Sequence, residues 1–99
     1  LTAAGEAFCL GRDRGASDAA GLAAESEGLI GLNQALERSR LVTVARVQGD
    51  AAGFGAGLAA LCDVAVAVRG ARLSFPEAKI GLAPAVVLGW LPRLVGRRM

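Results

Sequence analysis

Hydrophobic residues along the chain form two different patterns, a helical spacing and short apolar runs. Between residue 19 and about residue 40, leucines at positions 22, 29, 32 and 36 recur on one helix face, with charged residues elsewhere, which predicts a helix. Other apolar residues form short, nearly continuous runs, which are typical of strands buried on both faces. These runs cover residues 7–10, 41–47 and 64–68, and a shorter extended piece covers 72–75.

Glycine and proline divide the rest of the chain. A glycine-rich turn at residues 53–57 opens a short helix that includes 58–61. Pro84 begins a final helix over about residues 85–95, which Gly89 and Pro92 are expected to disturb. Strands and helices therefore alternate, and we expect an α/β fold with parallel strands buried on both faces.

The composition is very apolar for a chain of this size. Hydrophobic residues make up 54% of the 99 residues and charged residues 20%, whereas a small domain has a large surface that polar side chains must cover. We therefore expect an internal fragment of a larger protein. No apolar run approaches the roughly 18 residues of a membrane span, because Asp63 interrupts the best candidate, so we expect no membrane association.

The cysteine and histidine content limits the expected cellular compartment and the kinds of catalytic group that the chain can use. Cys9 and Cys62 each lie in an apolar stretch, which favours reduced, buried thiols in a cytoplasmic protein. The chain has no histidine, which excludes a Ser-His or Cys-His nucleophilic pair from this segment, and we expect no metal site. Acid–base chemistry must then use carboxylates, Lys79 or backbone dipoles.

Charge is unevenly distributed along the chain. Residues 1–68 carry five arginines and eight carboxylates, net −3, whereas residues 69–99 carry six basic residues against Glu77, net +5. The basic part could face a phosphorylated small molecule or an acidic subunit, or could be a solvated helix end that complements its own dipole. No basic run with interleaved aromatic residues occurs, and we expect no nucleic-acid partner.

The glycine-rich turn is the first candidate for chemistry. Gly49, Gly53, Gly55 and Gly57 crowd one junction between a strand and a helix, where glycine permits a positive φ and close approach of another group. Amides at a helix N-terminus suit a phosphate or a developing oxyanion. The spacing fits neither a dinucleotide fingerprint nor a P-loop. Tight packing of the helix on a strand would explain the glycines equally well.

Four stretches of the chain carry a further signal: residues 7–13 (AFCLGRD), 47–55 (VQGDAAGFG), 61–63 (LCD) and 75–84 (FPEAKIGLAP). Together they resemble the crotonase family, which comprises enoyl-CoA hydratases and isomerases. The resemblance covers essentially the whole chain and implies that residues 1–99 are the central part of one crotonase-like domain, without its first strands and its C-terminal helices. It also implies an acyl-CoA thioester substrate, no cofactor beyond the coenzyme A of that substrate, and a homotrimer or dimer of trimers.

The resemblance also assigns roles to single residues. Crotonases polarise the thioester carbonyl with two backbone amides, which correspond here to Arg12 and Phe54. Glu77 matches a glutamate that transfers protons. Further residues match positions around the substrate: Leu10, Gly11, Asp13, Gly53, Gly55 and Pro84. Of these, Asp13 is expected to organise the loop behind the Arg12 amide.

One position departs from the best-known hydratases of the family. Those enzymes hold water between two glutamates, and the place of the first is Gly57 in this chain. Members with a single glutamate include isomerases and some enolate-forming synthases, while residues 81–86 resemble hydratases of methylglutaconyl-CoA type and dehydratases of polyketide β-branching. Because glycine contributes no proton, replacing Gly57 by alanine is expected to leave turnover nearly unchanged.

These observations favour an acyl-CoA enzyme of hydratase or isomerase type and leave two alternatives. One is an acyl-carrier-protein-linked dehydratase or decarboxylase, and the other is a non-catalytic acyl-thioester-binding subunit. Without the resemblance, Glu77 would be interpreted as a solvated loop carboxylate paired with Lys79 or Arg72. Asp63 is interpreted as a structural cap or ion-pair partner. Four residues are interpreted as packing residues: Cys9, Cys62, Phe75 and Trp90.

Overall fold

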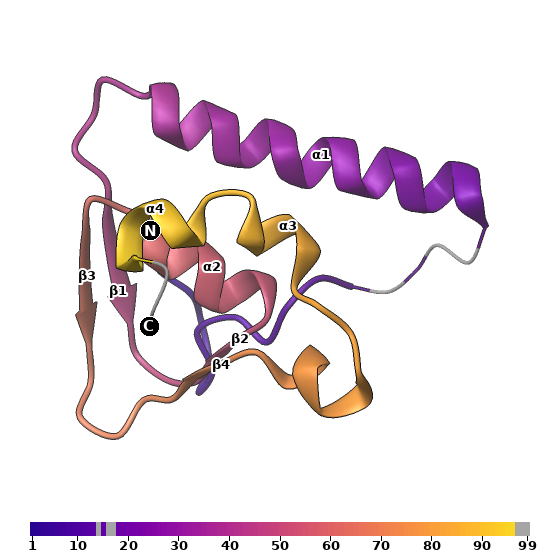
Figure 1. The fold of residues 1–99 in the computed structure, drawn as a ribbon. Coiled ribbons are helices and arrows are strands. Elements are labelled where there is room, and N and C mark those ends of the chain that lie inside the picture. The colour runs from indigo at the N-terminus through magenta and orange to yellow at the C-terminus, as the bar shows by residue number, and fades with distance from the viewer. Residues whose placement is uncertain (14, 16–17, 97–99) are drawn as a thin grey trace.

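The computed structural model describes residues 1–13, 15 and 18–96 (Figure 1). Its elements follow in the order α1 (Ala19–Arg38), β1 (Val44–Val47), β2 (Ala51–Ala52), α2 (Phe54–Leu61), β3 (Val64–Ala67), β4 (Leu73–Ser74), the 3-10 helix η1 (Pro76–Ile80), α3 (Ala85–Leu88) and α4 (Leu91–Val95). Arg97 and Arg98, which contribute to the predicted basic part, lie outside the described residues.

The strands form two short parallel pairs. β1 pairs with β3, with Val44 opposite Val64 and Val47 opposite Ala67. β2 pairs with β4 in the same sense, and Cys9 forms a parallel bridge with Ala51 on the other side of β2. The predicted α/β fold with parallel strands is therefore confirmed.

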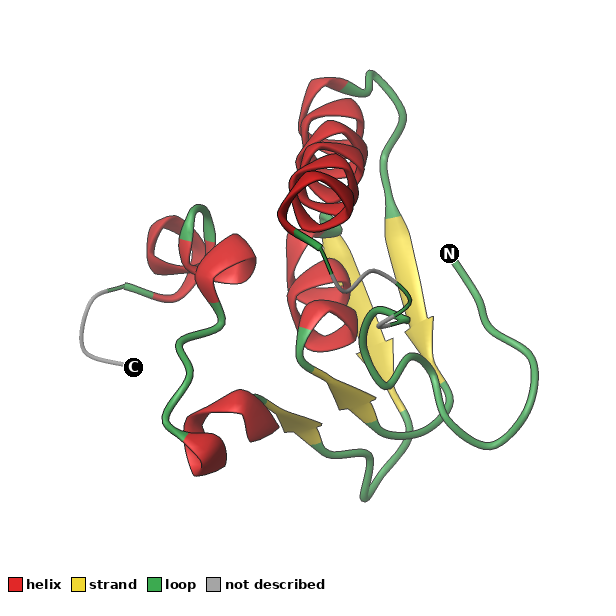
Figure 2. Ribbon diagram, turned by 90° about the vertical axis from the view of Figure 1, so that its right-hand side faces the viewer, coloured by secondary structure: helices red, strands yellow, loops and turns green. Residues whose placement is uncertain are grey.

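Helix α2 forms the centre of the packing. Its small residues Ala56 and Ala59 are buried against Ala45, Val47 and other residues of the core. Helix α1 packs across α2 and α3, and Figure 2 shows α1 and α2 on one side of the strands. Small side chains on α2 thus let the helix approach the strands closely.

The prediction that the sheet is buried on both faces is wrong for this chain. All four residues of β3 are exposed, and β1 alternates between exposed and buried positions. Helices lie on one side of the strands (Figure 2), so the described residues leave the apolar side chains of β3 uncovered. The run at residues 7–10 is likewise reduced to one bridge, because Gly5 and Gly11 turn the chain at positive φ on either side of it.

The helix ends follow local chemistry. Asp18 caps α1 by accepting a hydrogen bond from the Gly21 amide at 2.7 Å. Helix α2 begins at Phe54, immediately after Gly53 at φ 55°. The predicted final helix is broken into α3 and α4 around Gly89, as expected, and Pro92 lies in the first turn of α4, where no amide is needed.

The residues interpreted as packing residues have that role. Cys62 and Trp90 are buried, and Cys9 and Phe75 pack against the core at its edge. Both thiols are free. Among the residues described, no helix combines the length and the hydropathy that crossing a bilayer requires.

Candidate functional site

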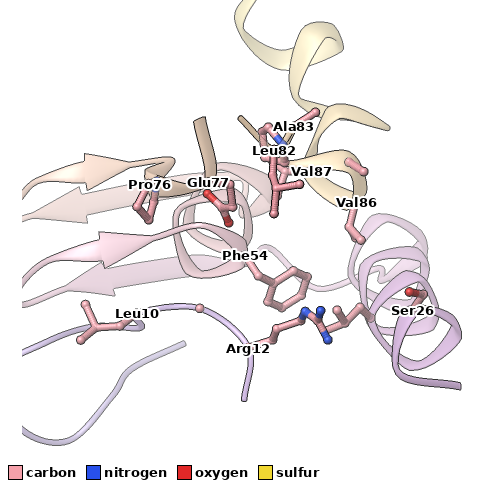
Figure 3. A pocket seen from close by; sticks show the side chains of 14 residues that line it. Leu10, Arg12, Ser26, Phe54, Pro76, Glu77, Leu82, Ala83, Val86 and Val87 are labelled. Carbon is pink, nitrogen blue, oxygen red and sulfur yellow. The ribbon is translucent and has the colours of Figure 1, made fainter. Parts of the chain in front are cut away.

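A cavity of about 360 Å³ lies where four segments of the chain converge. The segments are the loop after Cys9, one face of α1, the start of α2, and the stretch from η1 into α3 (Figure 3). Its lining residues are Leu10, Gly11, Arg12, Ser26, Leu29, Phe54, Pro76, Glu77, Leu82, Ala83, Pro84, Ala85, Val86 and Val87.

Backbone pairing brings the loop after Cys9 beside the start of α2. The amide of Phe8 donates to the carbonyl of Asp50 at 3.0 Å, and the amide of Ala52 donates to the carbonyl of Cys9 at 2.8 Å. Gly11 then turns the chain at φ 112°. Arg12 and Phe54, which are 42 positions apart in sequence, consequently line the same cavity.

Phe54 is the first residue of α2, so its amide has no partner inside the helix. Arg12 lies in the loop, and in the described part of the chain neither the Phe54 amide nor the Arg12 amide donates to a protein acceptor. Gly55 permits this arrangement, because a Cβ at position 55 would lie 2.7 Å from the Cβ of Cys9. Two backbone donors are therefore left without a protein partner in residues that line the cavity.

Glu77 lies in η1, directly after Pro76, and is partly buried. Its Oε2 is fully buried and has no hydrogen-bond partner among the described residues. The carboxylate lies over Gly53, where an added Cβ would be 3.3 Å from Cδ and closer still to Oε1. The positive φ therefore favours glycine at position 53, and a side chain there would have to displace the Glu77 carboxylate.

The alternative interpretation of Glu77 as a paired surface carboxylate finds no support in the geometry. Arg72 instead binds Asp50, through its amide at 3.0 Å and its Nη2 at 3.3 Å. Within residues 1–13, 15 and 18–96, the ion pairs include none between Glu77 and Lys79. A buried carboxylate oxygen without a partner is costly unless a ligand or water satisfies it.

Apolar side chains cover position 57, which the resemblance matches to a second glutamate. A Cβ at Gly57 would lie 2.6 Å and 2.9 Å from the two methyl groups of Val87, and 3.3 Å from Cζ2 of Trp90. Val87 itself lines the cavity. Among the described lining residues, Glu77 is therefore the one carboxylate, and the wall above α2 is hydrocarbon.

Other residues singled out from the sequence fall around the cavity in different ways. Three of them line the cavity: Leu10, Gly11 and Pro84. Gly53 and Gly55 are not lining residues. Gly53 contacts the Glu77 carboxylate, and Gly55 contacts Cys9. Asp13 lines a second hollow of about 270 Å³, together with Arg12, Glu25, Gly28 and Leu29. Leu29 and Arg12 line both hollows, so the two are adjacent.

Sequence reasoning missed the contribution of α1 and α3 to the wall. Ser26 and Leu29 of α1 line the cavity, as do Val86 and Val87 of α3. Leu29 was visible as part of an apolar helix face, but only the packing of α1 over the loop shows which residues that face covers. No group of three or more potential metal ligands occurs among the described residues.

Asp63 has a structural role outside the cavity, as interpreted from the sequence. Its Oδ2 accepts from the amide of Thr43 at 2.7 Å and from the hydroxyl of Thr43 at 2.8 Å. These hydrogen bonds, the backbone one foremost, hold the pKa of Asp63 below its ordinary value of 3.8. The Asp63 amide donates back to the Thr43 hydroxyl at 2.9 Å, so the pair joins the starts of β1 and β3.

The sequence is similar to a known protein family and to several of its members. The family model described as Enoyl-CoA hydratase/isomerase matches residues 1–99. A Rhodobacter capsulatus protein named as an enoyl-CoA hydratase is 43% identical over 97% of this chain and 39% of its own length. A mevalonyl-coenzyme A hydratase of Beauveria bassiana is 38% identical over 99% of this chain and 39% of its own length.

Solved structures agree with the sequence comparison. The crystal structure of an enoyl-CoA hydratase from Shewanella pealeana superposes with a TM-score of 0.87 at 32% identity, over 99% of this chain and 39% of that structure. The chain therefore spans about two fifths of the length of the relatives that it matches.

Proposed function

Since the chain belongs to the enoyl-CoA hydratase/isomerase family, we propose that it forms the central part of an enzyme that binds an acyl-CoA thioester and stabilises its enolate. The enolate carries its negative charge on the thioester oxygen, and the cavity brings together the two kinds of group that such a reaction needs. These are hydrogen-bond donors for the oxygen and a base for the proton of the α carbon.

The amides of Arg12 and Phe54 are the proposed donors to the thioester oxygen. Both belong to residues that line the cavity, and both lack a protein acceptor in the described part of the chain. The Phe54 amide also lies at the N-terminus of α2, where the helix dipole favours negative charge. Because both donors are backbone groups, their side chains can vary without removing the oxyanion hole.

Glu77 is the proposed acid–base group, and the observation that carries this proposal is its buried Oε2. That oxygen has no partner among the described residues, although Glu77 lines the cavity (Figure 3). A carboxylate placed in this way can take a proton from the substrate and return it, directly or through one water.

The hydrocarbon wall above α2 supports isomerisation as the second candidate beside hydration. In isomerisation, Glu77 removes a proton from the α carbon, the enolate forms, and the protonated Glu77 returns the proton at the γ carbon. The double bond then moves from the β,γ to the α,β position without any water. Val87 packs over Gly57, where a second carboxylate would be needed to hold the water of a hydratase.

Substitution of Glu77 by glutamine in the full-length protein tests the proposal. Glutamine keeps the shape of the side chain but cannot accept the proton, so we expect kcat to fall roughly 10²–10⁴-fold with little change in thioester binding. Glu27→Gln, an exposed position on α1, is the matched control and should leave kcat unchanged.

Near-normal turnover of Glu77→Gln on every acyl thioester that the wild type accepts would overturn the assignment of Glu77. A wild-type protein that binds acyl thioesters but turns none over would instead favour the non-catalytic subunit. Parallel assays with acyl-CoA and acyl-carrier-protein substrates decide between a CoA enzyme and a carrier-protein-linked dehydratase or decarboxylase.

A further inference from the structure

The Arg12 side chain connects the loop of residues 10–13 to helix α1. Its Nη1 donates to Oε2 of Glu25 in an ion pair between residues 13 positions apart. The two side chains are 38% and 28% exposed, so the pair lies at the edge of the cavity. In the view of Figure 3, the Arg12 guanidinium points toward α1 and Ser26, away from Glu77.

Among the described residues, backbone pairing anchors the loop that carries the Arg12 amide on its upstream side. Upstream, the carbonyl of Cys9 accepts from Ala52 at 2.8 Å, which fixes the chain to β2. Gly11 then turns at φ 112°, a conformation that leaves the following residue outside any regular element. Past this turn, the ion pair of Arg12 with Glu25 provides a link to a regular element.

Helix α1 carries the other partner of this link. It has 20 residues, is capped by Asp18, and packs across α2 and α3. Near its other end, Glu37 accepts from Nη2 of Arg93 at 3.0 Å, which ties α1 to α4. Glu25 therefore projects from a regular helix that is capped at its start and linked to α4 near its end.

We infer that Glu25 is a positioning residue, which acts through the Arg12 guanidinium to hold the Arg12 backbone amide in the direction of the thioester oxygen. The inference rests on the proposed function, because it needs that amide to be a donor to the oxyanion. A partly exposed ion pair contributes little to global stability. A displacement of about 1 Å at a reacting group, in contrast, can lower a rate about 100-fold.

A double-mutant cycle in the full-length enzyme tests the inference. Arg12→Ala keeps the backbone amide and removes the guanidinium, and Glu25→Ala removes the carboxylate that it binds. We expect each single variant to lower kcat about tenfold, and the double variant to lower it by about the same factor, because both single variants break the same ion pair. KM should change less than kcat, because the oxyanion develops only in the transition state.

The controls separate positioning from folding. Glu27→Ala, two residues along α1 and exposed, should leave kcat unchanged. The Tm of each variant should stay close to that of the wild type. Where Glu25→Ala lowers Tm, Glu25→Gln keeps the shape of the side chain and serves in its place.

Three results would overturn the inference: unchanged kcat in both single variants, a roughly hundredfold additive loss in the double variant, or an increase in KM with kcat intact. Glu77→Gln distinguishes this failure from failure of the proposed function. If Glu77→Gln is inactive while Glu25→Ala is fully active, only the role of Glu25 is lost. If Glu77→Gln is active while Glu25→Ala is impaired, the assignment of Glu77 as the acid–base group fails and the role of Glu25 stands.

Discussion

Gly57 of α2 and Val87 of α3 are in such close contact that a methyl group on position 57 would lie 2.6 Å from a methyl group of Val87. Val87 is buried and also lines the cavity, so this contact sets the position of one cavity wall. The expectation that alanine at position 57 leaves turnover nearly unchanged rests on proton transfer and stays a prediction. The contact adds a steric effect on stability, which that expectation does not address.

Gly57→Ala is therefore expected to destabilise the protein. Overpacking a close contact costs about 1–3 kcal/mol, which exceeds the gain of roughly 0.5–1 kcal/mol from replacing a helical glycine by alanine. Chemical denaturation of the full-length protein measures the change. Gly28→Ala is the matched control, because Gly28 lies in α1 with no atom within 4 Å of an added Cβ.

The control should be stabilised by the helix-propensity gain alone, which is about 1 kcal/mol. In the double variant Gly57→Ala/Val87→Ala, the space left by Val87 should accept the new methyl group, so its loss of stability should be smaller than the sum of the two single losses. Equal stability gains for Gly57→Ala and Gly28→Ala would contradict the contact.

Asp63 and Thr43 should make stability depend on pH in the acid range. The pKa of Asp63 is lowered in the folded protein, chiefly by the hydrogen bond from the Thr43 amide and then by that from its hydroxyl. A lowered folded pKa means that this stabilisation is fully present above the unfolded value of 3.8 and is lost as the pH falls below it.

Urea unfolding across the acid range checks this dependence. We expect the wild type to lose stability more steeply below its ordinary Asp pKa of 3.8 than Asp63→Asn does. Thr43→Val keeps the backbone donor and removes the hydroxyl, so its pH dependence should be intermediate. If the free energy of unfolding depends on pH identically in all three proteins at acid pH, the pKa of Asp63 is the same in the folded and unfolded states.

The main helices and the strands β1 and β3 could be predicted from the sequence because local signals fix them, whereas β2 and η1 were not predicted and the predicted strand at residues 7–10 is a single bridge. The helical leucine spacing gave α1, and the β-branched runs gave β1 and β3. The start of α2 was placed too late, because glycines read as a loop although Gly55 and Gly57 lie inside the helix. Their absent side chains serve close contacts with Cys9 and Val87, which no local pattern reveals.

The same limit applies to the candidate site. Glu77, Arg12 and Phe54 came from motifs, and the structure brings all three to one cavity. Ser26 of α1 and Val87 of α3 carry no motif, because their place in the wall depends on how two helices cross the loop. A residue that reaches the cavity only through tertiary packing is not marked by any pattern in the sequence around it.

The uncovered face of β3 predicts that the isolated 99-residue chain associates. Val64 and Val66 of β3 are 47% and 58% exposed, and Val68, which directly follows the strand, is 50% exposed. Residues two apart on a strand share one face. An exposed apolar strand at a sheet edge pairs readily with other chains. Size-exclusion chromatography should show species larger than the 10.0 kDa monomer.

Val66→Lys should reduce this association, since a charge on an edge strand opposes pairing. Leu41→Lys is the matched control, because Leu41 is exposed but lies outside the strands. A compact monomer at all concentrations, or an equal effect of the two lysines, would contradict a role for β3.

Gly53→Ala tests the contact between Gly53 and the Glu77 carboxylate. Alanine at φ 55° is strained by about 1–3 kcal/mol, and its methyl group would occupy the space that Oε1 of Glu77 now fills. The carboxylate must then move, and a displacement of about 1 Å can lower kcat about 100-fold. Steady-state kinetics and thermal unfolding of the full-length enzyme measure the two effects separately.

Gly70→Ala separates backbone strain from displacement of the carboxylate. Gly70 has a φ of 91° with no atom within 4 Å of an added Cβ, so its alanine variant shares the strain without touching Glu77. We expect both variants to be less stable and only Gly53→Ala to lose kcat. If the two variants lose kcat equally, the loss reflects strain in the fold, and Gly53 does not define the position of the Glu77 carboxylate.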